Sequence, residues 1–304
     1  MFRKLKRYCR DPYHEIGYDM LWKHPDRMSD RWYLKSLWKR TFGYELDLNH
    51  PRTFNEKLQW LKLYDRNPLY VTLVDKYRVK QWVAERIGEQ YVIPTLAVYN
   101  SVDEIDLDSL PDKFVLKCNH DSGNVVICKD KSTFDLQAAK QKLAVALKYD
   151  YYLQWREWPY KNVEKCIFAE EYLEEFLETG GADYKFFCFD GVVKAMFVAT
   201  ERFSDEVKFD FFDSDFNHLD LYQLHPMSGK TIPKPKGFEE MKEIAASLSK
   251  GFPHVRIDLY ETKGGIYFGE FTFFHHAGFE PFHPDRWDLI FGEWLTLPKI
   301  GNRI

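Results

Sequence analysis

Apolar residues recur at helical spacing through the first part of the chain, to about residue 90. Three stretches carry this pattern together with signals for helix ends. Residues 29–43 begin at a Ser-Asp cap, residues 53–66 begin with a Thr-x-x-Glu capping box, and residues 70–88 end on Gly88. The pattern therefore predicts a helical N-terminal region with one helix in each stretch.

Short apolar runs replace the helical pattern from about residue 91 onward. Residues 113–119, 124–130 and 165–173 predict strands, and residues 135–155 predict a single helix between the second and the third. Since strands and one helix are mixed here, this part is expected to form an α+β lobe.

Two hairpins are predicted after residue 180. Residues 183–201 alternate around the turn Asp190-Gly191, and residues 254–274 alternate around a Thr-Lys-Gly-Gly turn. A helix over residues 237–252 precedes the second hairpin. The chain shows no internal repeat and no low-complexity linker, so we expect packed α+β lobes.

Net charge and composition exclude few kinds of binding partner, but they narrow the class of protein to be expected. The chain has 304 residues, 45% of them hydrophobic, and a net charge of -4, so no overall positive field favours nucleic acid. Residues 1–40 hold eleven Lys and Arg against five Asp and Glu. This excess suits a peripheral contact with an anionic membrane or an acidic polymer, or simply a solvated helical face.

The cysteines and the amino terminus both indicate a cytoplasmic protein. Five cysteines are present, an odd number, and none lies at Cys-x-x-Cys spacing. The first residues lack the apolar run of a signal peptide, and nowhere do about 18 apolar residues run together. We therefore expect neither secretion nor a membrane span.

The last hairpin carries a candidate metal site. Arg256 and Asp258 are two residues apart, as are Glu270 and Thr272, so each pair shares one face of its strand. Two carboxylates that meet across antiparallel strands repel unless a cation lies between them. Oxygen ligands suit Mg²⁺, and a neighbouring Arg256 suits a phosphoryl group. A solvent-facing pair of charged strand residues is the alternative.

A second candidate site lies at the end of an earlier strand. Lys117 closes an apolar strand before a turn that contains Ser122 and Gly123, whose backbone N–H groups can cradle phosphate oxygens. Lys76 and Lys80 are placed to share one face of a predicted helix, or they belong to an ordinary amphipathic helix. Neither a P-loop nor a Gly-x-Gly-x-x-Gly motif is present.

In their order along the chain, these residues resemble the ATP-grasp superfamily over roughly residues 75–285. Within it the sequence is most similar to the TupA-like family found with bacterial surface-polysaccharide genes. The segments that carry the resemblance are "FNEKLQWLKLYDR", "DKYRVK", "FVLKCNHDSG", "DYKFFCFDG" and "GEFTFFHHAGFEPF". The resemblance implies two α+β lobes that clamp ATP, over residues 76–170 and 171–304, with a helical region over residues 1–75.

The resemblance also implies how ATP is bound. Lys80 and Lys117 match lysines that meet the phosphates, and Lys185 is placed to reach phosphate or substrate. The remaining nucleotide positions are the lid residues Ser122 and Gly123, the adenine grip of Glu170 with the backbone of Tyr172 and Leu173, and the ribose carboxylate Asp183. Asp121 lies inside the lid, where it would repel phosphate.

Magnesium and catalysis fall on the last hairpin and the loop after it. Asp258 and Glu270 match magnesium ligands, and Thr272 stands where the superfamily often has Asn. Arg256 matches the arginine that stabilises an acyl-phosphate. In the following loop, the backbone N–H of Gly278 is placed to meet the substrate carboxylate, and His276 to help deprotonate the amine. Loop histidines that pack on aromatic neighbours are the alternative.

The implied reaction is the ATP-dependent joining of a carboxylate to an amine, with the cofactors ATP and Mg²⁺. The acid would be a uronic-acid sugar or glycan and the amine an amino acid or amino alcohol, with an acceptor pocket built mainly by the first 70 residues. Oligomeric state stays open. The alternatives are a glycosyltransferase using the motif Asp213-x-Asp215, a sugar kinase, and a non-catalytic nucleotide-binding module.

Overall fold

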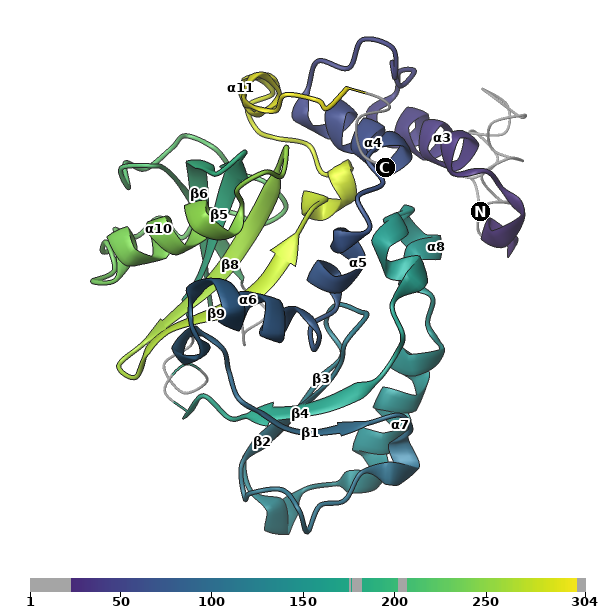
Figure 1. The fold of residues 1–304 in the computed structure, drawn as a ribbon. Helices are drawn as coiled ribbons and strands as arrows, with labels where there is room; N and C mark the ends of the chain where they lie inside the picture. The colour runs from purple at the N-terminus through teal and green to yellow at the C-terminus, as the bar shows by residue number, and fades with distance from the viewer. Residues whose placement is uncertain (1–22, 175, 177–181, 202–206, 300–304) are drawn as a thin grey trace.

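Two antiparallel sheets organise the chain, as Figure 1 shows for the computed structural model. The structure describes residues 23–174, 176, 182–201 and 207–299. One sheet has four strands in the order β1-β4-β2-β3, and the other has five in the order β7-β6-β5-β8-β9. Two antiparallel sheets with helices packed on them confirm the mixed α+β architecture expected from the sequence.

The four-stranded sheet consists of β1 (Thr95–Tyr99), β2 (Phe114–Cys118), β3 (Val125–Cys128) and β4 (Ile167–Glu171). Helix α7 (Leu136–Lys148) covers it and encloses a small hydrophobic core. Lys117 on β2 lies opposite Phe168 on β4. Since side chains two apart share a face, Lys117 and Glu170 project from the same side of this sheet.

The five-stranded sheet consists of β5 (Asp183–Phe189), β6 (Val192–Thr200), β7 (Lys208–Asp213), β8 (Val255–Thr262) and β9 (Gly265–Thr272). Both predicted hairpins are present. Asp190 and Gly191 have φ angles of 46° and 82°, which suits a tight two-residue turn. In the second hairpin Asp258 lies directly opposite Glu270, and on its other side Asp258 faces Lys185.

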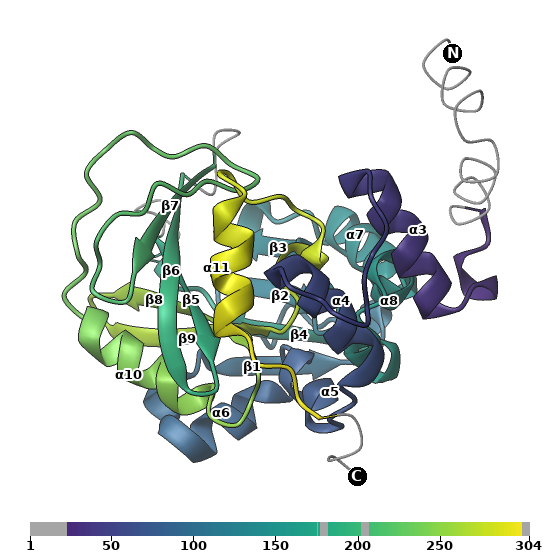
Figure 2. The same ribbon diagram turned by 90° about the horizontal axis from the view of Figure 1, so that it is seen from above.

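The N-terminal helices are η1 (Pro25–Arg27), α3 (Asp30–Phe42), α4 (Phe54–Tyr64), α5 (Leu69–Val74) and α6 (Val79–Ile87). The capping box at Thr53 and Glu56 is present. Helices α3–α6 contribute to the same large core as the five-stranded sheet, and α11 (Arg286–Trp294) lies beside α4 (Figure 2). The other elements are α8 (Tyr151–Trp155), α10 (Phe238–Leu248), η2 (Glu89–Tyr91), η3 (Val102–Glu104), η4 (Lys131–Thr133), η5 (Trp158–Asn162) and η6 (His275–Gly278).

The prediction of a single helix over residues 70–88 is wrong, because a turn separates α5 from α6. The buried Asp75 side chain accepts hydrogen bonds from the backbone N–H groups of Tyr77 (2.9 Å) and Arg78 (3.0 Å), and from Asn119 Nδ2 (2.8 Å). An Asp side chain that bonds its own backbone competes with the helix. Lys76 therefore lies in the turn and does not share a helix face with Lys80.

Residues 135–155 likewise form two helices and not the one predicted. Helix α7 ends at Tyr149, whose backbone is extended with a ψ of 132°, and α8 begins at Tyr151. Lys165 Nζ donates to the carbonyls of Leu147 (3.0 Å) and Tyr149 (2.7 Å), and so binds backbone acceptors at this helix end. After the break, α8 packs against η5 and η1.

The cysteines of the described residues are all free and buried, namely Cys118, Cys128, Cys166 and Cys188. Cys9 lies outside the described residues, and so do the Lys and Arg residues of positions 1–22. Within the described part of the chain, no helix is both long and apolar enough to cross a membrane.

Buried His254 is expected to make the stability of the fold fall in acid. Burial among aromatic rings lowers the pKa of His254 to about 3, whereas an unfolded histidine titrates near 6.5. Below that value the unfolded chain takes up a proton that the folded chain refuses, so the free energy of unfolding falls. This residue alone contributes about 2 kcal/mol between pH 7 and pH 5.

Urea unfolding at pH 7 and pH 5 measures this effect. His254→Gln, which keeps a donor for the carbonyl of Cys188 (3.0 Å from His254 Nδ1), is expected to lose that part of the pH dependence. His50→Gln, at an exposed position, serves as the control. The same pH dependence in His254→Gln and the wild type would contradict the prediction.

Candidate active site

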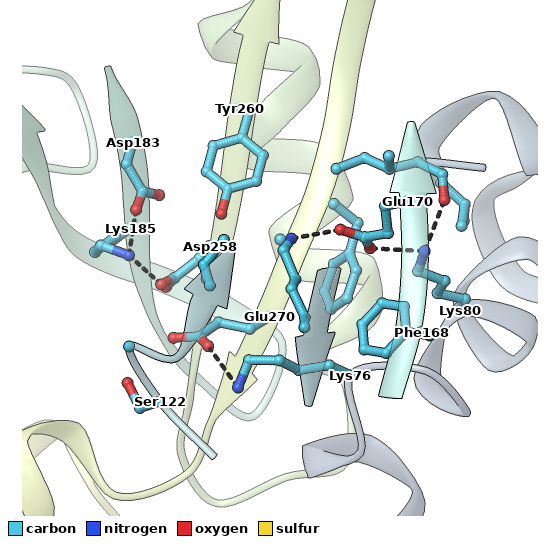
Figure 3. Close-up of a pocket in the computed structure, with 17 residues that line it drawn as sticks. Lys76, Lys80, Ser122, Phe168, Glu170, Asp183, Lys185, Asp258, Tyr260 and Glu270 are labelled. Carbon is cyan, nitrogen blue, oxygen red and sulfur yellow. Dashed lines mark hydrogen bonds and ion pairs between the residues drawn. The ribbon is translucent and has the colours of Figure 1, made fainter. Parts of the chain in front are cut away.

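A charged cavity of about 220 Å³ lies between the two sheets, with walls from β2, β4, β5, β8 and β9 (Figure 3). It brings together side chains from Lys76 to Glu270, almost 200 residues apart in sequence. The ionisable residues that line it are Lys76, Lys80, Lys117, Glu170, Asp183, Lys185, Asp258, Tyr260 and Glu270. Most of the nucleotide and metal positions expected from the sequence therefore converge on one site.

On one wall, Glu170 holds two lysines. Lys80 Nζ lies 2.7 Å from Glu170 Oε1, and Lys117 Nζ bonds the other carboxylate oxygen. Glu170 is 5% exposed. Although burial opposes ionisation, Lys117 and Lys80 hold the pKa of Glu170 below its ordinary value. Glu170, expected at the adenine, thus fixes both phosphate-binding candidates on this wall.

Lys80 is held by further contacts on the same wall. Its ammonium group donates to the carbonyl of Ile93 and to Thr95 Oγ1, each at 2.9 Å. Burial lowers the pKa of Lys80, and Glu170 opposes this shift. The lysine is therefore placed before any ligand enters, which reduces the entropy lost on binding.

The loop after Lys117 presents Ser122 and Gly123 to the cavity, as predicted for a phosphate lid. Gly123 has a φ of 88°, a left-handed conformation that suits glycine. Asp121 is buried and accepts a hydrogen bond from Asn124 Nδ2 (2.6 Å), and its carbonyl accepts one from Lys76. Asp121 does not line this cavity, so the expected repulsion of phosphate stays a prediction.

The opposite wall is a network of buried charges around Asp258, which has no exposed surface. Arg256 reaches both of its oxygens, from Nε and from one terminal nitrogen, at 2.7 Å each. Lys185 bonds Asp258 and also lies 2.6 Å from Asp183 Oδ2. Burial would raise the pKa of Asp258, but Arg256 and Lys185 hold it well below its ordinary value.

Glu270 joins this network from β9. Its Oε1 lies 3.1 Å from Arg256 and accepts from the Thr272 hydroxyl at 3.1 Å, while its other oxygen lies 3.8 Å from Lys76 Nζ. The carboxylate pair predicted across the hairpin exists, with a guanidinium between its members. The described residues contain no group of three or more His, Cys, Asp or Glu that could hold a metal. Asp258, Glu270 and the Thr272 hydroxyl offer oxygen atoms of the type that Mg²⁺ prefers. Both oxygens of Asp258 are bonded to Arg256 and Lys185, so the magnesium assignment stays a prediction.

His275 orients Arg256, a role that the sequence did not indicate. Arg256 donates from a terminal nitrogen to His275 Nδ1 at 2.7 Å, so the imidazole proton lies on Nε2, which meets Gln223 Oε1 at 2.8 Å. Burial holds the pKa of His275 well below its ordinary value. The neutral ring, packed edge-on to Phe187 at 4.8 Å, is thus a fixed acceptor. No local signal marks this role, because the partners come from distant segments.

A second cavity of about 510 Å³ adjoins the first and shares Lys76, Ser122, Lys185 and Glu270 with it. Its wall also includes Arg256, Thr272 and His276. Its aromatic residues are Tyr151, Trp155, Tyr160, Phe197, Phe209, Phe274 and Phe279. Among the described residues, none before Lys76 lines it. The expectation that the first 70 residues line an acceptor pocket is therefore wrong for their described part.

Those residues support the second cavity from behind instead. Gln59 Nε2 donates to the carbonyls of Ala277 (3.1 Å) and Gly278 (2.8 Å). Lys62 Nζ donates to the carbonyls of Trp155 (2.8 Å) and Ala277 (2.7 Å). Helix α4 thereby ties α8 to η6, the two elements that carry much of the cavity wall.

The turn η6 needs this support because its backbone is strained. His276, Ala277 and Gly278 all have positive φ angles, of 45°, 54° and 64°. Gly278 packs against α4 and is not among the residues that line either cavity, so its contact with a substrate carboxylate stays a prediction. His276 does line the second cavity. Burial lowers its pKa to about 3, which makes it a weak base at neutral pH.

Gly278→Ala is expected to destabilise the protein by roughly 2 kcal/mol or more. A methyl group would stand 2.4 Å from Gln59 Nε2 and 3.0 Å from Leu58 Cβ, and alanine disfavours a φ of 64°. In the control, Gly229→Ala, φ is 68° and no atom lies within 4 Å, so only the backbone cost applies. Equal unfolding free energies for the two variants would contradict this explanation.

Three features singled out in the sequence lie outside the two cavities, namely Tyr172, Leu173 and the motif Asp213-x-Asp215. Tyr172 and Leu173 follow β4 but line neither cavity, so the adenine grip stays a prediction. Apolar side chains that do line the first cavity are Val92, Ile93, Phe168 and Phe268. The motif Asp213-x-Asp215 forms a turn in which Asp213 accepts from the backbone N–H groups of Asp215 and Asn217, both at 2.9 Å.

Comparison with known proteins gives a family match and several similar solved structures. The family model described as TupA-like ATPgrasp matches residues 56–296. Among solved structures, D-alanine–D-alanine ligase from Bacillus anthracis is similar at 17% identity, over 66% of this chain and 57% of that one, with a TM-score of 0.37. D-cycloserine synthetase DcsG is similar at 18% identity, over 75% of this chain and 71% of that one, with a TM-score of 0.42.

The ATP-grasp ligase PsnB with its minimal precursor is similar at 12% identity, over 68% of this chain and 53% of that one, with a TM-score of 0.39. The chain thus spans 57% of the length of the first of these relatives. No curated protein matches the chain. Since the family match covers most of the sequence and the charged cavity lies between the two sheets, the chain belongs to the TupA-like ATP-grasp family.

Proposed function

We propose that this protein is an ATP-dependent carboxylate-amine ligase that forms an amide and releases ADP and phosphate. The observation that carries the proposal is the junction of two cavities at Lys185 and Glu270. The first is lined by four lysines, as a triphosphate requires, and the second includes Arg256 and has room for organic substrates.

Activation of the acid is the first step. A carboxylate is a poor acyl donor, because its oxygen is a poor leaving group. Its oxygen attacks the γ-phosphorus of ATP, the bond from that phosphorus to the bridging oxygen breaks, and ADP leaves. Lys117, held by Glu170, binds phosphate oxygens. Lys80 contributes positive charge while its three N–H donors stay on Glu170, Ile93 and Thr95. Ser122 and Gly123 close over the phosphates.

Amide formation is the second step. The amine nitrogen attacks the acyl carbon of the acyl-phosphate, and the bond from that carbon to the phosphate oxygen breaks. Arg256, oriented by His275, stabilises negative charge on the acyl-phosphate and on the tetrahedral intermediate. Asp258, Glu270 and Thr272 would hold Mg²⁺, which neutralises charge on the phosphates when bound. The lid excludes water, which would otherwise hydrolyse the acyl-phosphate.

The substrates follow from the family resemblance. We propose that the acid is a uronic-acid sugar or glycan and that the amine is an amino acid or amino alcohol, in the biosynthesis of a bacterial surface polysaccharide. The same proposal includes a cytoplasmic location and a contact of the basic N-terminal segment with the inner membrane. It also includes the lobe boundaries at residues 75 and 170.

Product analysis tests this function. The protein is incubated with Mg-ATP, glucuronic acid or UDP-glucuronic acid, and ethanolamine or L-serine. Release of ADP and phosphate only when acid and amine are both present supports ligation. Release of UDP from the UDP-sugar without ATP would instead indicate a glycosyltransferase. A stable phosphorylated sugar formed without amine would indicate a kinase.

A further inference from the structure

Glu157 is a buried carboxyl group for which the described residues provide no bonding partner. It lies between α8 and η5, is 6% exposed, and lines the second cavity. Within the described part of the chain, its side chain makes neither a hydrogen bond nor an ion pair within 4 Å, although its backbone carbonyl accepts from Tyr160. Since neither of its oxygens is among the fully buried polar atoms that lack a partner, the carboxylate faces the open space of the second cavity, where a ligand can reach it.

Two cations that attract Glu157, Lys62 and Arg256, already have other partners. Lys62 of α4 is fully buried, and its ammonium group is bound by Gln59 Oε1 (3.2 Å) and by the carbonyls of Trp155 and Ala277. Arg256 of β8 is bound to Asp258, Glu270 and His275. Both attract Glu157 from a distance, but neither pairs with it.

The other charged groups around Glu157 come from the shared end of the two cavities. Lys76 precedes α6 and attracts the carboxylate, whereas Glu270 of β9 repels it. Burial is the largest influence and raises the pKa of Glu157 to about 7, against the opposing effect of Lys62. A cationic ligand that enters from the open side of the cavity would favour the ionised form of Glu157, because its charge offsets the effect of burial.

Aromatic rings complete the surroundings. Tyr151 and Tyr160 lie with ring centroids 4.7 Å apart, and Trp155 and Phe279 lie 5.8 Å apart. All four line the cavity that Glu157 lines. Aromatic faces attract cations, and together with one carboxylate they recognise an ammonium group while accepting a short carbon chain.

We propose that this aromatic end of the second cavity is the amine subsite and that Glu157 binds the ammonium group of a primary amine substrate. The inference rests on the proposed ligase function and adds to it the residue that receives the amine. Arg256 marks the acyl end of the same cavity, so acid and amine would approach each other along its length.

The Glu157 carboxylate also provides an acceptor for the proton that the ammonium group must lose. An ammonium nitrogen has no free electron pair, so one proton must leave before attack, and Glu157 accepts it. The nitrogen then forms its bond to the acyl carbon while the carbon–oxygen bond to phosphate breaks. A second proton leaves the nitrogen with the departing phosphate. A pKa of about 7 suits Glu157 to this transfer at neutral pH, whereas His276 is a weaker base.

Binding of ethanolamine and L-serine, measured by ligand-observed NMR at pH 7 with AMP-PNP present, tests the subsite. The wild type is expected to bind at least one probe, and Glu157→Gln to bind it at least about tenfold more weakly, since glutamine keeps the shape and loses the charge. Glu157→Asp, which keeps the charge, should lie between them. Glu239→Gln, an exposed carboxylate outside both cavities, is the control.

Two outcomes would overturn the inference: no binding of either probe to the wild type, or equal binding by the wild type and Glu157→Gln. Thermal unfolding establishes that each variant is folded, and if Glu157→Gln unfolds, the comparison of Glu157→Asp with the wild type decides. A weaker affinity of Glu157→Asp supports the subsite, and an unchanged one overturns it.

A separate assay with the wild type distinguishes this inference from the proposed function. Hydroxylamine is a nucleophile that is largely unprotonated at neutral pH, so it traps an acyl-phosphate without an ammonium site. If hydroxamate and ADP form from glucuronic acid but Glu157→Gln binds the probes normally, the ligase stands and the subsite fails. If no acid supports ADP formation but probe binding depends on Glu157, the subsite stands and the ligase fails.

Discussion

Glu270→Gln is expected to lower kcat by about 10³ while leaving the fold intact. Glu270 lines both cavities and lies opposite Asp258, so it faces the point where phosphate and acid would meet. Glutamine keeps the shape but removes the negative charge that balances Arg256 and Lys76 and would ligate Mg²⁺. A loss of this size is typical when a group that stabilises transition-state charge is removed.

ADP release with saturating Mg-ATP, acid and amine measures the effect, and circular dichroism with thermal unfolding checks the fold. Glu239→Gln, the exposed control, should keep the wild-type rate. Full activity of Glu270→Gln would show that the assignment of Glu270 to the metal is wrong.

Arg256→Lys is the second change with a large expected effect, a fall in kcat of about 10² to 10³. The guanidinium spans Asp258, Glu270 and His275 at once, at distances from 2.7 to 3.1 Å. A lysine keeps the charge but presents it at a single nitrogen, so it cannot hold all three partners in place. Because those partners remain buried, the free energy of unfolding should also fall, by roughly 1–3 kcal/mol.

His275→Gln separates orientation of the guanidinium from its charge. Arg256 keeps its charge, but the rigid ring nitrogen that accepts from one terminal nitrogen is replaced by the amide of a more flexible side chain. We expect a smaller fall in kcat, of about tenfold, with an unchanged KM for ATP. If Arg256→Lys kept wild-type kcat, Arg256 would have no part in catalysis. If His275→Gln changed only the stability, His275 would be structural.

The sequence predicts the local features of this fold well. Alternation over residues 254–274 is sufficient to place Asp258 and Glu270 on facing strands, since strand period and a short turn fix which side chains share a face. The capping box at Thr53 and the turn at Asp190-Gly191 are equally local. Whether a helix continues is not a local feature. Helix α5 ends where Asp75 is bound by Asn119, 44 residues away.

For the candidate site, too, some features could be predicted from the sequence and others could not. The residue types and their order indicate phosphate, metal and nucleotide, so Lys117, Arg256 and Asp258 could be named from the sequence. The side chains that pair with these residues could not be named from the sequence. Glu170 was expected at the adenine but pairs with two lysines, and His275 gave no sign of its contact with Arg256.

The sequence by itself therefore determined most of the described strands, though not β1 or β7, together with their faces and the order of the charged residues. These features depend on neighbours within a few positions. The tertiary structure decided what each charge meets. The Asp121 carboxylate accepts a hydrogen bond from Asn124 within the same loop and lines neither cavity. Glu157 lies buried beside aromatic rings, with its carboxylate unpaired among the described residues. Burial and charge pairing depend on segments that meet only when the chain is folded, and no local pattern encodes them.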